Sequence, residues 1–161
     1  QTKAAGDALV GQLARHYVVR TSWVIGDGRN FVRTMADLAA KGISPSVVDD
    51  QYGRLTFTTD LAAGIVHLLS TGAPFGTYNL SSDGPVQSWC DIARDVFALR
   101  GRSPEDVTGV STEEYSAGKS PAPRPRYSTL DLARIRETGF RPSPASDRLR
   151  QYVAGMAWPG R

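Results

Sequence analysis

The chain has 161 residues, of which 40% are apolar and 22% are charged, and its formal net charge is +3. This length fits one domain with a single core. The small positive excess suits anionic ligands but is too sparse for nucleic-acid binding, so no nucleic-acid partner is expected. A single cysteine, Cys90, excludes an intramolecular disulfide. It indicates a reducing compartment, so a cytoplasmic location is expected.

The sequence shows no signal for a membrane or for a metal. No apolar run approaches the ~20 residues of a membrane span, and the polar start QTKAAGD does not fit a signal peptide. Cys90, His16 and His67 share no ligand spacing, so no metal site is expected and all three are interpreted as structural. The first residue is Gln1 rather than Met, which is typical of a fragment or a processed product.

Helical and extended patterns alternate in the first half of the chain. Apolar residues recur on one face of each predicted helix, as Leu9, Val10 and Leu13 do in the first. Asn and Thr are favoured N-caps, and Gly is common just past a helix end. The predicted elements are a helix over residues 3–14, a strand over 17–21, a helix from Asn30 to 41–42, a strand over 46–48, and a helix from Thr58 or Thr59 to Gly72.

The second half continues the alternation and then loses it. A strand is predicted over residues 76–82, and Ser88 with Asp91 resembles a capping box that opens a fourth helix. Residues 101–125 contain four prolines and no clear period, which predicts a long irregular loop. Helical spacing returns after Pro144. The predicted class is α/β.

Four segments carry a resemblance to a known family. YVVRTSWVIGDGRNF, DDQYGRLTFTTDLA, GTYNLSSDGPVQSW and SPAPRPRYSTLD occur in this order. Together they resemble the C-terminal half of extended short-chain dehydrogenase/reductases that act on nucleotide-sugars, most of all the dTDP-4-dehydrorhamnose reductase family. The likeness runs from Lys3 to about Val153.

The resemblance implies a fold and a domain division. The fold expected is the C-terminal substrate-binding part of an extended short-chain dehydrogenase/reductase, with the last helix and strand of its Rossmann sheet. Residues 1–29 are expected to be a remnant of the dinucleotide-binding domain. Residues 30–161 are expected to form the nucleotide-sugar-binding domain.

Lys3 is the part of the family's catalytic machinery that the sequence retains. The family is similar in carrying Tyr-x-x-x-Lys, and here Lys3 is followed by Gly6 and Asp7. The matching Tyr would lie four residues before Lys3, outside this sequence. In the family that Tyr donates a proton to a sugar ketone, while the Lys lowers its pKa and binds the cofactor ribose. The resemblance therefore implies a catalytic and cofactor-binding role for Lys3 in a full-length enzyme that uses NADPH or NADH.

The glycine clusters do not fit a dinucleotide site. GDGRN and DGPVQ lack the spacing of a pyrophosphate-binding turn, which the family places near the N-terminus of the full enzyme. The chain is therefore expected to be the nucleotide-sugar-binding portion of a reductase, inactive alone. One flank near the 17–21 strand is expected to be open and apolar.

The resemblance implies a site just past the strand at residues 17–21. Ligands of open α/β sheets bind at the carboxyl ends of strands. Thr21 and Ser22 are expected to face the nicotinamide as cofactor-binding residues, and the face of Trp23 is expected to stack on a 6-deoxysugar. The alternative is that Trp23 is only a core residue after a strand.

A diphosphate-binding end is predicted from Asn30 and Arg124, and Phe31 is expected to bind the substrate as well. Asn30 opens a helix whose free N–H groups suit a diphosphate, although a plain N-cap is compatible with this. The prolines of SPAPRPRYSTLD project Arg124, which by resemblance would fork onto the diphosphate. Arg126 could serve instead, and a solvated basic loop is the alternative.

Several positions depart from the family or favour a structural interpretation. Tyr127 stands where the family usually has Asn, and Leu55 replaces its usual Pro. Asp50 is interpreted as part of a turn. Trp89 is interpreted as a core residue that packs the fourth helix.

Two classes of function stay open. The chain is either part of a reductase for a dTDP-sugar or a non-catalytic nucleotide-sugar-binding or regulatory module. Within enzymes, a related nucleotide-sugar epimerase or dehydratase is the nearest competitor. RTSW (residues 20–23) favours the reductase, because the competitors usually show an Asn–aromatic pair there. A homodimer is left open.

Overall fold

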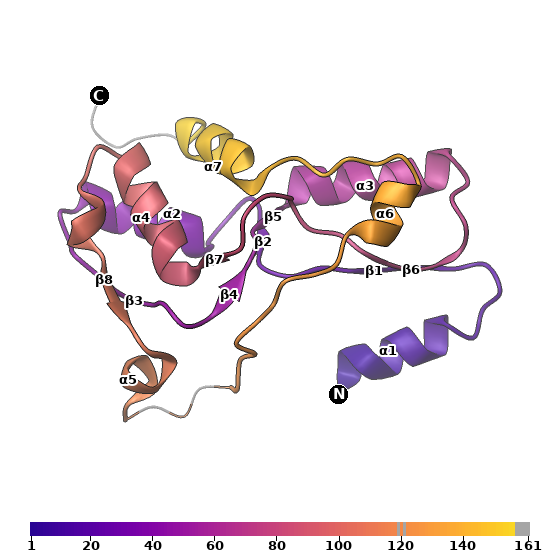
Figure 1. Ribbon diagram of the computed structural model, residues 1–161, viewed down its shortest axis with the longest axis horizontal. Coiled ribbons are helices and arrows are strands. Elements are labelled where there is room, and N and C mark those ends of the chain that lie inside the picture. The colour runs from indigo at the N-terminus through magenta and orange to yellow at the C-terminus, as the bar shows by residue number, and fades with distance from the viewer. Residues whose placement is uncertain (119, 121, 157–161) are drawn as a thin grey trace.

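The computed structural model describes residues 1–118, 120 and 122–156, which form an α/β arrangement (Figure 1). The first elements are α1 (Thr2–Val10), β1 (Tyr17–Arg20), β2 (Val24–Ile25), α2 (Phe31–Ala40), β3 (Ser46–Val48), β4 (Tyr52–Gly53), β5 (Thr56–Phe57), α3 (Thr58–Ser70) and β6 (Gly76–Asn79). The later elements are β7 (Gln87–Ser88), α4 (Trp89–Leu99), a short 3₁₀ helix (Pro104–Asp106), β8 (Thr108–Val110), α5 (Thr112–Ser116), α6 (Ala133–Glu137) and α7 (Ala145–Ala154).

Strands pair across long stretches of chain. β1 pairs with β6, β2 with β5 and β3 with β8, all parallel, whereas β4 and β7 are antiparallel. Parallel partners need a crossover connection, and helices supply it here. Figure 1 shows β1 and β6 beside α3 and α6 at one end, and β3 and β8 beside α2 and α4 at the other. The predicted α/β class is confirmed.

Two buried cores correspond to these two ends. The larger core lies where α2, α4 and α7 meet, because the apolar stripes of these helices face one another. The smaller core lies between α3, α6 and β6. Representative members are Val32, Met35, Val96, Phe97, Leu149 and Val153 in the first, and Leu68, Tyr78, Leu80, Leu132 and Ile135 in the second.

Helix starts show where local signals suffice and where they do not. The capping box at α4 is confirmed, since Ser88 Oγ accepts from the Asp91 N–H at 3.1 Å and the Asp91 carboxylate accepts from the Ser88 N–H at 2.9 Å. The cap predicted for α3 at Thr58 or Thr59 is wrong. Phe57 occupies that N-cap position without a side-chain hydrogen bond, and β5 leads directly into the helix.

The long irregular loop predicted over residues 101–125 is also wrong in part. It contains the 3₁₀ helix, β8 and α5. Ser111 and Glu114 form a second capping box that opens α5. β8 is only three residues long and is stabilised by its distant partner β3, so no local periodicity announces it.

α1 ends at Val10, short of the predicted residue 14, and no residue of α1 is buried. Leu9 is 67% exposed and Leu13 60%. Figure 1 shows α1 apart from β1, and an ion pair of 2.8 Å between Asp7 and Arg20 links them. These apolar side chains, on α1 and just after it, are exposed near the first strand, as expected for an open apolar flank.

Candidate functional site

Three neighbouring cavities share Gln51 and Arg124 in their linings. Their volumes are about 450, 490 and 300 Å³. The first is mainly apolar and lies among α2, β3, α5 and residues 122–124, with Phe31, Met35, Val47, Trp89, Thr112 and Tyr115 in its lining. The second is lined also by Ser22, Trp23, Trp89, Pro125 and Ser128. The third is lined also by Asp50, Thr112 and Arg126.

Asn30 is the N-cap of α2, and its side chain is engaged within the fold. Oδ1 accepts from the Arg33 N–H at 3.1 Å, and Nδ2 donates to the Gly26 carbonyl at 2.9 Å and the Tyr152 hydroxyl at 2.7 Å. Asn30 lines none of the three cavities. The N-cap interpretation is confirmed, and the consequence for the site is that Phe31, the next residue, is held in the wall of the first cavity.

α5 is attached to the residues after β3 through Asp50. The Asp50 carboxylate accepts hydrogen bonds from the Thr112 N–H at 3.0 Å and from the Thr112 hydroxyl. Gln51 Nε2 donates to the same hydroxyl at 3.0 Å. The hydrogen bonds from Thr112 hold the pKa of Asp50 below its ordinary value, and the positive charge of Arg126 acts in the same direction. Asp50 therefore does more than shape a turn, because it fixes the wall of the first cavity.

This contact gives an expected pH dependence of stability. A folded-state pKa below the unfolded one means that the contribution of Asp50 is present above about pH 4 and is lost as pH falls through the folded pKa. Asp50→Asn should lower the free energy of unfolding by about 1 kcal/mol at neutral pH, and the deficit should shrink in acid. Urea unfolding at several pH values measures it. Asp27→Asn, at an exposed turn, serves as control, and a deficit that does not change with pH would contradict the expectation.

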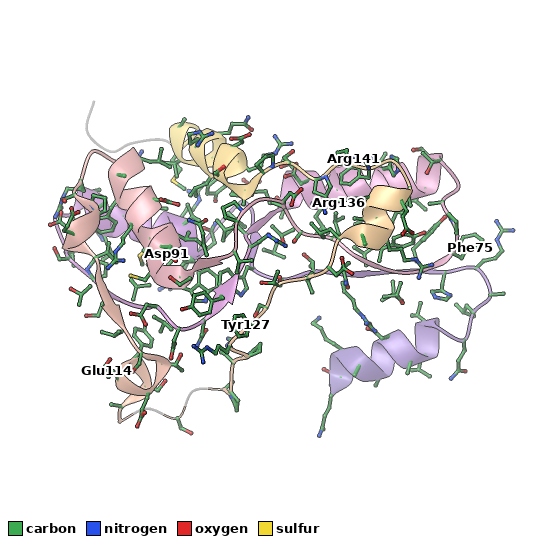
Figure 2. The ribbon with its side chains drawn as sticks, viewed as in Figure 1. Phe75, Asp91, Glu114, Tyr127, Arg136 and Arg141 are labelled. Carbon is green, nitrogen blue, oxygen red and sulfur yellow. The ribbon has the colours of Figure 1, made fainter. Side chains whose placement is uncertain are left out.

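Residues 122–128 form the opposite border of the cavities. The Tyr52 N–H donates to the Arg126 carbonyl and the Ser128 N–H donates to the Tyr52 carbonyl, both at 2.7 Å. The ring of Tyr127 stacks on Tyr52 with centroids 5.5 Å apart. Figure 2 shows Tyr127 on this segment and Glu114 on α5. Position 127, where the family usually has Asn, thus makes an aromatic contact, and Arg124 is carried on a segment anchored to β4.

Trp23 and Ser22 line the second cavity together with Arg124. Ser22 Oγ donates to the Ser128 carbonyl at 3.0 Å. Trp23 is half-buried and stacks on Trp89 with centroids 3.7 Å apart and planes at 18°. Trp23 and Arg124 therefore lie at the same cavity. Trp89 covers one face of the Trp23 ring, so at most the other face could stack on a sugar.

Trp89 is one of the site residues that the sequence did not indicate, as are Thr112 and Tyr115. It packs against the larger core, as predicted, but it is half-buried and lines both the first and the second cavity. Phe31 lies 4.6 Å from it, ring centroid to ring centroid. The sequence did hold one indication of this role. Trp89 directly follows the capping residue Ser88, and the first turn of a helix lies next to the preceding loop, where binding sites often form.

Lys3 and Thr21 are not brought to the cavities. Both are exposed, and neither is among the lining residues. The structure gathers Ser22, Trp23 and Arg124 at one place, with Phe31 at the adjoining cavity, while Lys3 stands on the separate helix α1. The roles of Lys3 and Thr21 towards a cofactor stay predictions.

Other kinds of site find no support in the described part of the chain. No helix there has the length and apolar character of a membrane span. No three His, Cys, Asp or Glu side chains there are grouped so that they could hold a metal ion. Burial raises the pKa of the Cys90 thiol, which fits the predicted packing role.

Comparison with known proteins places the chain in a family. Residues 1–157 match the family model described as RmlD substrate binding domain. The chain belongs to this family. It is 37% identical to the spore coat polysaccharide biosynthesis protein SpsK of Bacillus subtilis over 95% of the chain and 52% of SpsK. It is also 37% identical to the dTDP-4-dehydrorhamnose reductase of Mycolicibacterium smegmatis over 88% of the chain and 43% of that protein.

A solved structure agrees with the family. The dTDP-4-dehydrorhamnose reductase of Bacillus anthracis, in complex with NADP, superposes with a TM-score of 0.82 at 35% identity, over 95% of this chain and 53% of that one. The resemblance inferred from the four motifs is therefore confirmed, as is the fold class. The chain spans about half the length of these relatives.

Proposed function

We propose that this chain is the nucleotide-sugar-binding portion of a dTDP-4-dehydrorhamnose reductase, which reduces a sugar ketone with NADPH or NADH in dTDP-L-rhamnose synthesis. The observation that carries the proposal is the position of Arg124. It lines an apolar cavity on one side and, on the other, a cavity with hydroxyls and an indole. The relatives named as reductases support the reaction class.

The chemistry of the cavities fits the three parts of such a ligand. The first cavity offers aromatic rings at Phe31 and Tyr115 and the amide of Gln51, which suit a flat base with polar edges. The guanidinium of Arg124 suits a diphosphate, because its fork of N–H groups matches phosphate oxygens. The hydroxyl of Ser22 in the second cavity suits a sugar.

The residues of this chain do not by themselves fit a whole dinucleotide. Lys3, Thr21 and Ser22 are the candidates for cofactor contact, and the sequence holds no glycine-rich turn with the spacing that a pyrophosphate requires. A nicotinamide cofactor supplies hydride in this reaction class. In the proposed function the cofactor is held mainly by a part of a longer protein that this sequence does not include. What the chain contributes is the binding and orientation of the dTDP-sugar.

The proposal is tested by binding and by turnover. The purified chain should bind dTDP at least tenfold more tightly than ADP in isothermal titration calorimetry, because the first cavity selects the base. It should not oxidise NADPH or NADH in the presence of dTDP-4-dehydrorhamnose, since the tyrosine acid and the dinucleotide turn are absent from the sequence. Turnover at ~1 per second or faster would contradict the proposal that this chain only binds the substrate. Equal affinities for dTDP and ADP would contradict the proposal that the ligand is a dTDP-sugar.

A further inference from the structure

Trp23 has an unusual backbone. Its φ is +49°, and among the described residues other than glycine it is the only one with a positive φ. A bulky side chain in this region costs about 1–3 kcal/mol and persists only where the surroundings hold it. The flanking chain is fixed by hydrogen bonds, since the Thr56 N–H donates to the Trp23 carbonyl at 3.0 Å and its hydroxyl donates to the Ser22 carbonyl at 2.6 Å.

Gly53 covers one face of that indole. A Cβ built on Gly53 would lie 2.8, 2.9 and 3.0 Å from Cε2, Cζ2 and Cδ2 of Trp23. A point nearly equidistant from three consecutive ring atoms lies over the ring rather than beside it. No Trp89 atom is among the nearest neighbours of that Cβ, although the Trp89 ring stacks on Trp23 at 3.7 Å. Gly53 and Trp89 therefore cover opposite faces.

The pairing of β4 with β7 brings Gly53 and Trp89, the residues on the two faces of Trp23, close together. Tyr52 pairs with Ser88 and Gly53 with Gln87, so Gly53 lies close to the start of α4, where Trp89 is the first residue. Trp89 lies over one face of the Trp23 ring and the backbone of Gly53 lies over Cδ2, Cε2 and Cζ2 on the other, so the rim is the part of the ring that neither neighbour covers. The rim of an aromatic ring is its electropositive part, whereas the face is electronegative.

We propose that Gly53 and Trp89 are positioning residues that clamp Trp23 with its rim towards the sugar, which makes this end of the site selective for oxygen atoms on the sugar. The inference rests on the proposed function and deepens it. A clamped rim attracts the oxygen of a ketone or a hydroxyl, while a free face would instead stack on C–H groups. The clamp also removes the freedom of the indole, so its contact with the sugar loses less conformational entropy.

Gly53→Ala is the decisive variant. Gly53 lines none of the three cavities, and its added methyl group would meet only Trp23 at under 3.0 Å. Calorimetry should compare dTDP with dTDP-L-rhamnose on the 161-residue chain. We expect the wild-type chain to bind dTDP-L-rhamnose about tenfold more tightly than dTDP. In Gly53→Ala this affinity ratio, called the sugar ratio below, should fall towards one, while the affinity for dTDP is unchanged. Gly6→Ala, in open space on α1, should leave the ratio intact.

Trp89 provides a second test that survives if Gly53→Ala does not fold. Trp89→Leu should reduce the sugar ratio, and Trp89→Phe should rescue most of it, because a phenyl ring still stacks. Trp89 also lines the first cavity, so its replacement can change the affinity for dTDP as well. The quantity to compare is therefore the ratio of the affinities for dTDP-L-rhamnose and dTDP, rather than either affinity alone. Near-ultraviolet circular dichroism should lose the signal of the stacked indoles in Trp89→Leu.

The outcomes separate this inference from the proposed function. A folded Gly53→Ala variant with the wild-type sugar ratio would overturn the clamp, as would a wild-type chain that gains nothing from the sugar while binding dTDP. A wild-type chain that does not bind dTDP would overturn the proposed function, and the clamp's role with it.

Discussion

Arg148→Ala is expected to lower the free energy of unfolding by about 3 kcal/mol, because it leaves a buried carboxylate without its cation. Asp60 lies in the first turn of α3 and is 3% exposed. Arg148 Nε on α7 donates to Asp60 Oδ1 at 2.8 Å, whereas the hydroxyls of Ser82 and Ser143 are at 3.5 and 3.4 Å. Without Arg148, these two long contacts are the hydrogen bonds to the carboxylate that remain among the described residues. Urea unfolding followed by circular dichroism measures the loss.

Two further variants serve as the control and as the rescue for Arg148→Ala. Arg150→Ala on the same helix removes an exposed pair with Asp147, and it should change stability by about 0.5 kcal/mol or less. The double variant Asp60→Asn/Arg148→Ala should be more stable than Arg148→Ala, since an amide carries no charge to leave uncompensated. A double variant no more stable than the single one would show that Arg148 acts through its packing instead.

Arg124→Ala is expected to weaken dTDP binding about 30-fold, or ~2 kcal/mol, the scale of a lost charge-assisted contact. Arg124 lines all three cavities, so its guanidinium can reach a group that bridges them. Arg124→Lys should recover only part of the loss, because an ammonium lacks the planar fork. Isothermal titration calorimetry with dTDP measures each variant.

Arg126 is the matched control on the same segment. It lines only the third cavity, and its guanidinium lies 5.8 Å from the centre of the Tyr127 ring. Arg126→Ala should therefore cost less than about threefold in dTDP affinity. Equal and small losses from both arginines would return residues 122–128 to a solvated basic loop and would remove the main support for the diphosphate position.

The sequence predicted the helices with strong local signals and missed elements that depend on distant partners. The capping pair of Ser88 and Asp91 and the cap of Asn30 act within one turn, so reading along the chain was enough. β8 and its pairing with β3 could not be read, because a three-residue strand is defined by its partner. The first helix was predicted too long, because the apolar period continues to Leu13 although residues 11–14, all exposed, are not helical here.

For the candidate site, the sequence predicted several of the residues but not how they are arranged. Trp23 and Arg124 lie on the same cavity, as the family motifs implied. The sequence could not show that Asp50 would hold the first residue of α5, because this contact spans 62 positions and depends on how a turn meets a helix. Nor could it show the contact between Trp23 and Gly53, since glycine carries no side chain to signal one.

The parallel pairing of the strands has a consequence for how fast the chain folds. Tyr17 pairs with Gly76 and Ser46 with Thr108. Each pairing must close a long loop, and the entropy of closing it is lost before the contacts between the strands can stabilise the pair. Chains whose contacts are mostly non-local fold more slowly than helical bundles of the same size. Until these loops close, short apolar strands such as Val47–Val48 are unpaired and open to other chains. Low temperature and low protein concentration during refolding should therefore favour the native pairing over aggregation.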